Sequence, residues 1–289
     1  MIEILLPIRN PTAVLDRTIE SILSQTDRSF TVLISDNFSR EGLDRIEEAA
    51  HRLEAAGVEV RVIHPPVELG RVQHWNWLHL QSGGEWLKPL FVGDWLEKDC
   101  VRECRAAAES DPSLAFILFY FLHHQGLDGP VYATGDCHGA SGRLTPAQTA
   151  ELGIFRGNFA GVPVNVLYRR WAFQAAGGHQ TSLPLTADYD LYVRLAMQVP
   201  TFVIPKVLGH FTLHENRYAK RGSGTYREAM CAEQLLVASM VGYAARCGGL
   251  QLPWGRVRLR LLELLWHWLV DETFRIGGRW KRALEGRSD

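Results

Sequence analysis

The sequence lacks the features that mark several classes of protein. Its apolar stretches, such as 114–122, are far shorter than the ~20 residues that cross a bilayer, so no transmembrane helix is expected. Its five cysteines are an odd number with no Cys-x-x-Cys pair, which is not the pattern of a disulfide framework. The net charge is only -1 and no basic run occurs, so nucleic acid is not an expected partner.

Two motifs are also missing from the start of the chain. No basic segment followed by a long apolar run opens the sequence, so no signal peptide is expected and the predicted location is the cytoplasm. The first apolar run leads into Pro7-Ile8-Arg9-Asn10-Pro11 instead of Gly-x-Gly-x-x-Gly, which disfavours a nicotinamide-dependent dehydrogenase. The same turn lacks the glycine-rich phosphate loop that a nucleotidyltransferase would need.

The sequence does have the composition of a globular protein, with 46% hydrophobic and 22% charged residues among 289. Up to residue 111, short β-type runs alternate with helical segments. This alternation predicts a doubly wound α/β sheet. The expected strands are 2–6, 30–34, 58–63 and 86–92, and the expected helices between them include 11–25 and 43–53.

The second half of the chain has a different pattern. A segment rich in Gly and His, 123–142, is expected to be a long loop. We predict one domain at 1–222 and a C-terminal helical extension at 223–289. The other expected elements are a helix at 186–197, strand pieces at 201–205 and 208–213, and long helices at 228–245 and 257–274.

Several segments, taken in order, resemble the family 2 glycosyltransferases of the GT-A fold over residues 1–215. Each segment is short, but their order and spacing together are fairly specific. The segments are Pro7 to Asn10 with the helix that follows, Ser35-Asp36-Asn37-Phe38-Ser39, Glu68-Leu69-Gly70-Arg71 to Leu78, Gly84 to Leu96, and Arg169 to Leu195.

The resemblance implies a fold and an activity. The fold would be a mixed, mainly parallel sheet flanked by helices. The activity would be inverting transfer of a sugar from a nucleotide-diphosphate sugar to a hydroxyl of a glycan, a lipid-linked acceptor or a small molecule. An alternative is a non-catalytic module of the same fold that binds a sugar nucleotide or a glycan, since Phe91, Gly93 and Ala187 replace acidic residues of the family.

Asp36 follows a predicted strand, at the end where open α/β sheets bind ligands. On the residues alone, it is as well explained as a turn-forming or helix-capping aspartate. The resemblance places its carboxylate at the nucleotide, where it can accept from a base imide N–H, and this favours UDP or dTDP over a purine carrier. The other nucleotide-binding residues that the resemblance implies are Pro7, Arg9, Asn10, Gly70 and Arg71.

Asp94 is the candidate metal ligand. Carboxylate and diphosphate oxygens are the ligands that Mg²⁺ and similar divalent cations such as Mn²⁺ prefer. Phe91 and Gly93 occupy the usual acidic positions, so the requirement for a metal stays open, and Asp94 capping a following helix is the alternative. The resemblance adds His214 as a ligand to the metal or diphosphate, with His210 as its competitor.

The resemblance makes Asp188 the general base, which takes the proton of the acceptor hydroxyl. Ala187 stands where the family has a further acid, so a group that orients or tunes the base is missing. Asp190 is the alternative base, although two residues along a helix it points elsewhere. A helix start without catalytic role is the third possibility.

The C-terminal helices are basic and amphipathic, and such helices can lie on an anionic membrane, here the inner face. A lipid-linked acceptor would make that contact useful. We expect instead that the apolar stripe of the second helix packs on the domain or on a second copy of the chain. The stripe consists of Leu259, Leu262, Leu265, Trp266 and Leu269.

Overall fold

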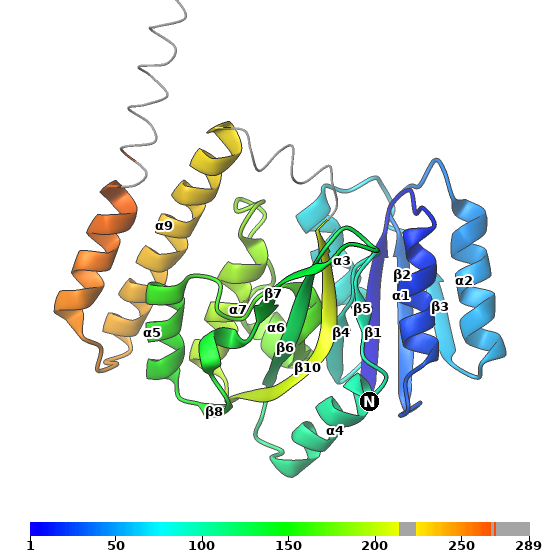
Figure 1. Ribbon diagram of the computed structural model, residues 1–289, viewed down its shortest axis with the longest axis horizontal. Helices are drawn as coiled ribbons and strands as arrows, with labels where there is room; N and C mark the ends of the chain where they lie inside the picture. The colour runs from blue at the N-terminus through cyan, green and yellow to red at the C-terminus, as the bar shows by residue number, and fades with distance from the viewer. Residues whose placement is uncertain (214–223, 267–268, 270–289) are drawn as a thin grey trace, which may run out of the picture.

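One sheet runs through the molecule and is covered on both faces by helices (Figure 1). The computed structural model describes residues 1–213, 224–266 and 269. Within these residues the ten strands follow the order β3-β2-β1-β4-β9-β6-β10-β5, with β7 beside β6 and β8 beside β10. The strands are β1 (Ile2–Ile8), β2 (Phe30–Asp36), β3 (Glu59–Ile63), β4 (Trp86–Pro89), β5 (Trp95–Leu96), β6 (Phe116–Gln125), β7 (Val131–Gly135), β8 (Gly142–Leu144), β9 (Val166–Arg169) and β10 (Thr201–Leu213).

The helices form two layers because the central strands are apolar on both faces. Along β1, Ile4 and Leu6 belong to one core cluster and Leu5 to the other, since successive side chains alternate. Helices α1, α2 and α4 pack in the first cluster, and α3, α5, α6, α7 and α9 pack in the second. Their bounds are α1 (Val14–Leu23), α2 (Leu43–Ala55), α3 (Arg71–Gln81), α4 (Cys100–Ser110), α5 (Pro146–Arg156), α6 (Arg170–Ala175), α7 (Ala187–Gln198) and α9 (Gly224–Cys247), with short 3₁₀ turns η1 (Cys137–Gly139) and η2 (Pro163–Asn165).

The predicted sheet, mixed and mainly parallel, is confirmed. β1 pairs parallel with β2 and β4, β2 with β3, and β6 with β10, whereas the shorter ladders are antiparallel. The carboxyl ends of β1, β2 and β4 therefore meet at one edge, which is where parallel sheets bind ligands. This edge collects residues 7–10, 36–39 and 90–94.

Three predicted segments differ from the structure. The expected loop at 123–142 is wrong: β6 continues to Gln125, and β7 returns beside it with Thr134 opposite Leu122. The strand expected at 86–92 ends at Pro89, where the chain turns toward Asp94. The two pieces expected between 201 and 213 are one strand, β10, interrupted by register shifts at Val207.

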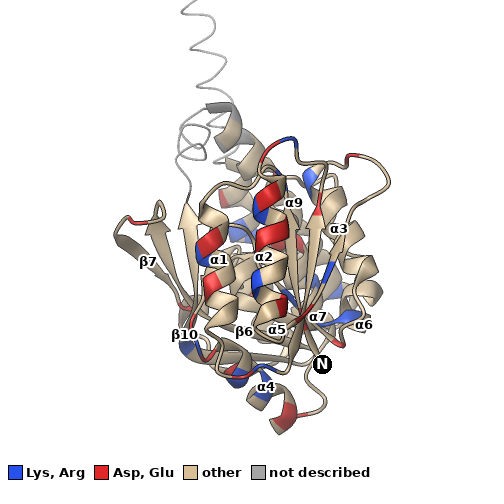
Figure 2. Cartoon of the chain, turned by 90° about the vertical axis from the view of Figure 1, so that its right-hand side faces the viewer, with Lys and Arg blue, Asp and Glu red and all other residues tan. Residues whose placement is uncertain are grey.

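Acidic and basic residues are interspersed on the outer faces of α1 and α2 (Figure 2). Arg52 of α2, for example, lies 3.7 Å from Glu20 and 3.9 Å from Asp16 of α1. Exposed pairs of this kind contribute less than about 1 kcal/mol each. These charges keep the outer layer solvated and do not form a site.

The C-terminal helices pack beside α5 and α7 (Figure 1). Val237 and Val241 of α9 are buried in the same core cluster as α7, and so is Val257 at the start of a further helix at 254–266. The two helices are therefore continuous with the core of the preceding residues. The boundary at residue 222 remains a prediction.

Four of the five residues of the predicted stripe are exposed and Leu265 is half-buried, so the expected packing of the stripe on the domain is wrong. Leu259, Leu262 and Trp266 are 60–67% exposed, and Leu269 is exposed as well. The helix instead turns Val257, with Leu261 beside it, toward the core. No helix within the described part of the chain is long and apolar enough to cross a membrane.

Candidate active site

A cavity of about 550 Å³ opens beside the carboxyl end of β4. Arg71 and Trp75 of α3 form one wall, and the turn that contains Phe91 and Asp94 forms the floor. The first turn of α7, with Asp188, lies across from them, and α9 adds a further wall through Tyr226, Met230 and Gln234. Arg71, Asp94 and Asp188, predicted from different segments of the sequence, are thus brought together.

The turn that carries Asp94 is fixed from two sides. Thr18 of α1 accepts from the Gly93 N–H (2.9 Å) and donates to the Asp94 carbonyl (2.8 Å). From β10, the Thr212 N–H donates to Asp94 Oδ1 at 2.9 Å. Gly93 has φ +95°, a conformation that a side chain would disfavour. Asp94 is followed by β5, not by a helix, so the helix-capping alternative for Asp94 is wrong.

Asp188 and Asp190 have different surroundings in the first turn of α7. Asp188 is half-buried, lines the cavity and accepts from the Tyr189 N–H at 2.8 Å. Asp190 is buried and pairs with Arg194, whose guanidinium also donates to the carbonyls of Ala176 and Gly178. Asp190 therefore holds Arg194, which joins α7 to the end of α6, whereas Asp188 lines the cavity.

Glu233 of α9 is a residue that sequence reasoning missed. Its Oε2 accepts from the N–H groups of Leu185 and Thr186 and from the Thr186 hydroxyl, at 2.8–2.9 Å. A carboxylate at a helix N-terminus satisfies unpaired N–H groups and interacts favourably with the helix dipole. Glu233 thus holds the segment that presents Asp188. No local pattern indicates this contact, because the partners are 47 and 48 residues apart.

Aromatic rings line the cavity beside Arg71. The Trp75 and Phe91 ring centroids are 4.8 Å apart, and the Arg71 guanidinium lies 5.2 Å from the Trp75 centroid. Arg71 also donates to the Pro184 carbonyl, which joins α3 to the segment before α7. The interaction between a cation and the face of an indole ring is favourable, and it holds the Arg71 side chain in place. The wall therefore combines one positive charge with an apolar face.

The remaining nucleotide-site candidates lie next to this cavity but do not line it. Asp36 is buried at the end of β2, where Oδ1 accepts from the Ser39 N–H (3.1 Å) and Oδ2 lies 3.4 Å from His64. The Asn10 N–H donates to the Ser39 hydroxyl at 2.7 Å. Pro7 stands opposite Ser35 in the β1–β2 ladder. These residues form one connected group at the ends of β1 and β2.

Two contacts join this group to the start of α3. Arg9 pairs with Glu68, and Asn37 exchanges hydrogen bonds of 2.8 and 2.9 Å with the backbone of Leu69. Gly70 follows directly and starts α3, its N–H donating to the Gln73 side chain. The connected residues around Asp36 therefore contact residues 68–70, which directly precede Arg71 in the cavity. Asn37 was not predicted, although it adjoins Asp36.

Buried histidines hold α3 in place. His79 Nδ1 donates to the Trp75 carbonyl and Nε2 shares a hydrogen bond with the Tyr168 hydroxyl, both at 2.6 Å, and burial lowers the pKa of His79 to about 4. His74 bonds to the Ser35 hydroxyl at 2.7 Å, and burial lowers its pKa to about 4 as well. Burial also holds the pKa of His179, whose ring lies against Trp75, well below its ordinary value. These rings are neutral at pH 7.

The site offers few protein ligands to a metal ion. Among residues 1–213, 224–266 and 269, no three His, Cys, Asp or Glu side chains come together as a metal site. Asp94 contributes a carboxylate, and one of its oxygens already accepts from Thr212. His214 lies outside the described residues. His210, its alternative, bonds to Glu97 and His124 and stacks on Trp95. A cation at Asp94 would thus take most of its ligands from diphosphate and water.

The mixed, mainly parallel sheet flanked by helices is similar to the GT-A fold of known glycosyltransferases. The sequence profile of "Glycosyl transferase family 2" matches residues 3–175, more than half of the chain. The chain belongs to that family, and it is a transferase.

Known proteins agree with this assignment. A Haemophilus influenzae protein described as an uncharacterized glycosyltransferase is 25% identical over 220 residues, which are 75% of this chain and 70% of that protein. Residues 1–349 of S. aureus TarS in complex with UDP-GlcNAc match 91% of this chain and 71% of that one, with a TM-score of 0.62 and 15% identity. The mannosyltransferase PcManGT of Pyrobaculum calidifontis, in complex with GDP-Man and Mn²⁺, matches 93% and 87%, with a TM-score of 0.55 and 11% identity.

Proposed function

We propose that the protein transfers a sugar from a UDP or dTDP sugar to an acceptor hydroxyl with inversion at the anomeric carbon. The observation that carries this proposal is that Asp94 and Asp188, from separate elements, line one cavity. The solved structure of TarS with UDP supports a uridine carrier, whereas the mannosyltransferase is bound to GDP-Man. Asp36, buried at the end of β2, is the residue that we assign to reading the base.

Asp188 takes the proton from the acceptor hydroxyl as its oxygen attacks the anomeric carbon. The diphosphate leaves from the opposite face of the sugar, so the configuration inverts. Arg71 lines the same cavity, and we assign its guanidinium to balancing the charge that develops on the diphosphate. Glu233 keeps the first turn of α7, and with it Asp188, in position.

A divalent cation, Mg²⁺ or Mn²⁺, would be held by Asp94 and would stabilise the departing diphosphate as a Lewis acid. With a single carboxylate at that position, the cation should bind weakly until the nucleotide supplies further oxygens. Cation binding is therefore expected to depend on the nucleotide.

Thermal unfolding tests the donor and cation assignments together. UDP at 100 times its Kd should stabilise the protein by about 2.7 kcal/mol, and Asp36→Ala should abolish this shift. Mn²⁺ alone should change the melting temperature little and should enlarge the shift with UDP. Asp44→Ala, an exposed aspartate of α2, is the matched control. Equal stabilisation of Asp36→Ala by UDP would remove Asp36 from the site.

A further inference from the structure

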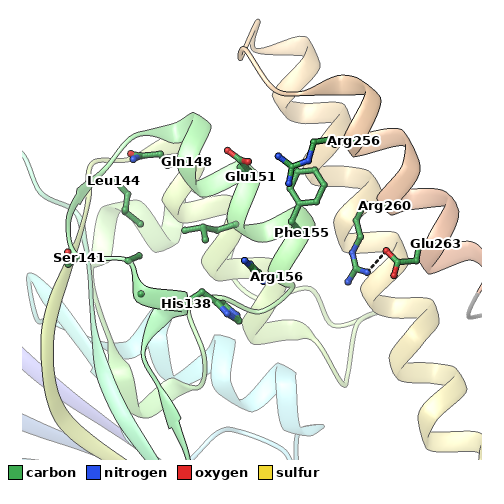
Figure 3. Close-up of a pocket in the computed structure, with 13 residues that line it drawn as sticks. His138, Ser141, Leu144, Gln148, Glu151, Phe155, Arg156, Arg256, Arg260 and Glu263 are labelled. Carbon is green, nitrogen blue, oxygen red and sulfur yellow. Dashed lines mark hydrogen bonds and ion pairs between the residues drawn. The ribbon is translucent and has the colours of Figure 1, made fainter.

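A second cavity, of about 700 Å³, lies between the η1 turn, α5 and the helix at 254–266 (Figure 3). It is built from different side chains than the candidate active site. Its charged and titratable lining residues are Arg156, Arg256, Arg260, His138, Glu151 and Glu263. Three guanidinium groups thus face two carboxylates around a space that the mechanism does not use.

The arginines are held in ways that leave donors for a ligand. Arg260 donates from one terminal nitrogen to Glu263 at 2.7 Å, while its Nε is buried and has no hydrogen-bond partner among the residues that the structure describes. A buried N–H without an acceptor costs about 1–3 kcal/mol, so an oxygen that enters beside it would be favoured. Arg256 lies over the Phe155 ring, 5.1 Å from its centroid. Stacking fixes the plane of the guanidinium while its edge stays open to oxygens.

Side chains of α5 line the arginine cavity, and the N-terminus of this helix is well capped. Thr145 caps α5, its hydroxyl accepting from the Gln148 N–H, and Pro146 occupies the first helical position. This start fixes the direction of the helix, so that Phe155 and Arg156 in its last turn reach the cavity. Arg156 is exposed, and among the described residues it forms no ion pair.

A third, smaller hollow of about 260 Å³ lies between the two cavities. It shares Asn158 and Val162 with the candidate active site and His138 with the arginine cavity. Gly161, at the turn between them, has φ +91°, and a Cβ there would lie 2.5 Å from Phe121. The small hollow therefore shares walls with both cavities, the one that contains Asp188 and the one that contains the arginines.

We propose that the arginine cavity binds a phosphate group of the acceptor while the acceptor hydroxyl lies at Asp188. The proposal rests on the proposed transferase function, because the small hollow shares walls with the cavity that contains the assigned base. A phosphate is favoured over a carboxylate because it offers more oxygens to the several guanidinium groups that surround the cavity. The phosphate belongs to an ester or diphosphate of a soluble or lipid-linked acceptor.

Binding of labelled inorganic phosphate, measured by equilibrium dialysis with saturating UDP, tests the site. One phosphate should bind, and the double variant Arg256→Gln, Arg260→Gln should weaken its binding at least tenfold. Arg260→Lys should weaken it as well, because it keeps the charge but removes the Nε donor. Arg258→Gln is the matched control, since Arg258 is on the same helix but does not line the cavity.

Three results would overturn the proposal. These are unchanged phosphate binding by the double variant, an equal loss with Arg258→Gln, and displacement of phosphate by UDP. Phosphatidylglycerol vesicles that bind through these arginines when inorganic phosphate does not would assign them to a membrane surface instead. UDP binding is measured in the same samples. If the original protein does not bind UDP, the proposed function is contradicted. If it binds UDP but does not bind phosphate, only the proposed role of the arginine cavity is contradicted.

Discussion

Two cavities in the described part of the chain, the candidate active site and the arginine cavity, are lined by different kinds of side chain. The candidate active site is lined by carboxylates and aromatic rings, and Arg71, Trp75 and Asp94 lie within residues 3–175, which match the family profile. The second cavity depends on Arg256 and Arg260, beyond that match. Arg71 and Asp94 of the candidate active site therefore come from the part of the chain that matches the family, whereas Asp188, Arg256 and Arg260 follow it.

The comparison is not a clean division, however. Glu233 of α9 caps the helix that carries Asp188, and Tyr226 lines the active-site cavity. The first added helix therefore contributes to the candidate active site, and the second contributes to the arginine cavity. Changes to each part should separate transfer, stability and anion binding.

The largest effect is expected from Asp188→Asn, which keeps the shape of the side chain and removes its basicity. Transfer should fall by ~10²-fold or more, while UDP binding and phosphate binding persist. Steady-state turnover and dialysis measure both. Asp190→Asn is the matched control, and it should lower the melting temperature because Arg194 loses its partner. Turnover that survives in Asp188→Asn would exclude Asp188 as the base.

Acid should lower the free energy of unfolding through a buried histidine of α3, the helix that lines the candidate active site. The pKa of buried His79 is lowered to about 4 from 6.5, so the unfolded chain takes up a proton first as the pH falls. The stability contributed by neutral His79 is complete above pH 6.5 and is lost between pH 6.5 and about 4. This amounts to about 3 kcal/mol for one histidine.

Denaturant unfolding at pH 7 and pH 4.5 measures this loss. His79→Gln removes one of these titrations and should reduce the pH dependence, to which His74 and His179 also contribute, even if the variant is less stable at pH 7. A variant as pH-sensitive as the original protein would show that other groups cause the acid sensitivity. His51, which is exposed, offers the control His51→Gln.

A smaller effect is expected from Glu233→Gln, which keeps a hydrogen-bond acceptor but removes the charge. Loss of the helix-dipole interaction should cost about 1 kcal/mol of stability and lower transfer severalfold through the position of Asp188. Glu233→Ala should do both more strongly. The turnover number should fall while the Kd for UDP stays unchanged. If only the stability changed, Glu233 would have no positioning role.

The sequence predicts the part of this arrangement that local patterns determine. Apolar runs such as Ile4 to Leu6 mark the buried strands, and polar residues directly after a strand, such as Asp36 and Asp94, mark the edge where ligands bind. The hairpin at 123–142 escapes prediction because its Gly and His residues do not alternate as a strand on a core does. Glu233 escapes because its role depends on contacts distant in sequence.

The C-terminal helix shows a further limit of sequence patterns. Helical periodicity correctly identifies an apolar face, but a helix with leucines on several sides does not reveal which face packs. Val257, with Leu261 beside it, faces the core, while Leu259 and Leu262 are exposed. Which face of the helix packs depends on the surface that α5 and α9 present to it, and no local sequence pattern predicts that surface.

The smallest effect on catalysis is expected from the exposed stripe, which concerns only association. Leu259, Leu262 and Trp266 leave a large apolar area in water, and burying such side chains contributes about 1.5–3 kcal/mol each. Membrane attraction by nearby basic residues contributes only ~1 kcal/mol per charge, and neighbouring acids offset part of it. We therefore expect the stripe to pack against a second copy of the chain.

Light scattering tests this expectation. The original protein should be a dimer, and the triple variant Leu259→Ser, Leu262→Ser, Trp266→Ser should be a monomer. Donor hydrolysis and phosphate binding should stay within twofold, because none of the three residues lines either cavity. The matched control is Leu80→Ser, an exposed leucine of α3 outside the stripe. A monomeric original protein that sediments with phosphatidylglycerol vesicles, and loses that binding in the triple variant, would show that the stripe contacts a membrane instead.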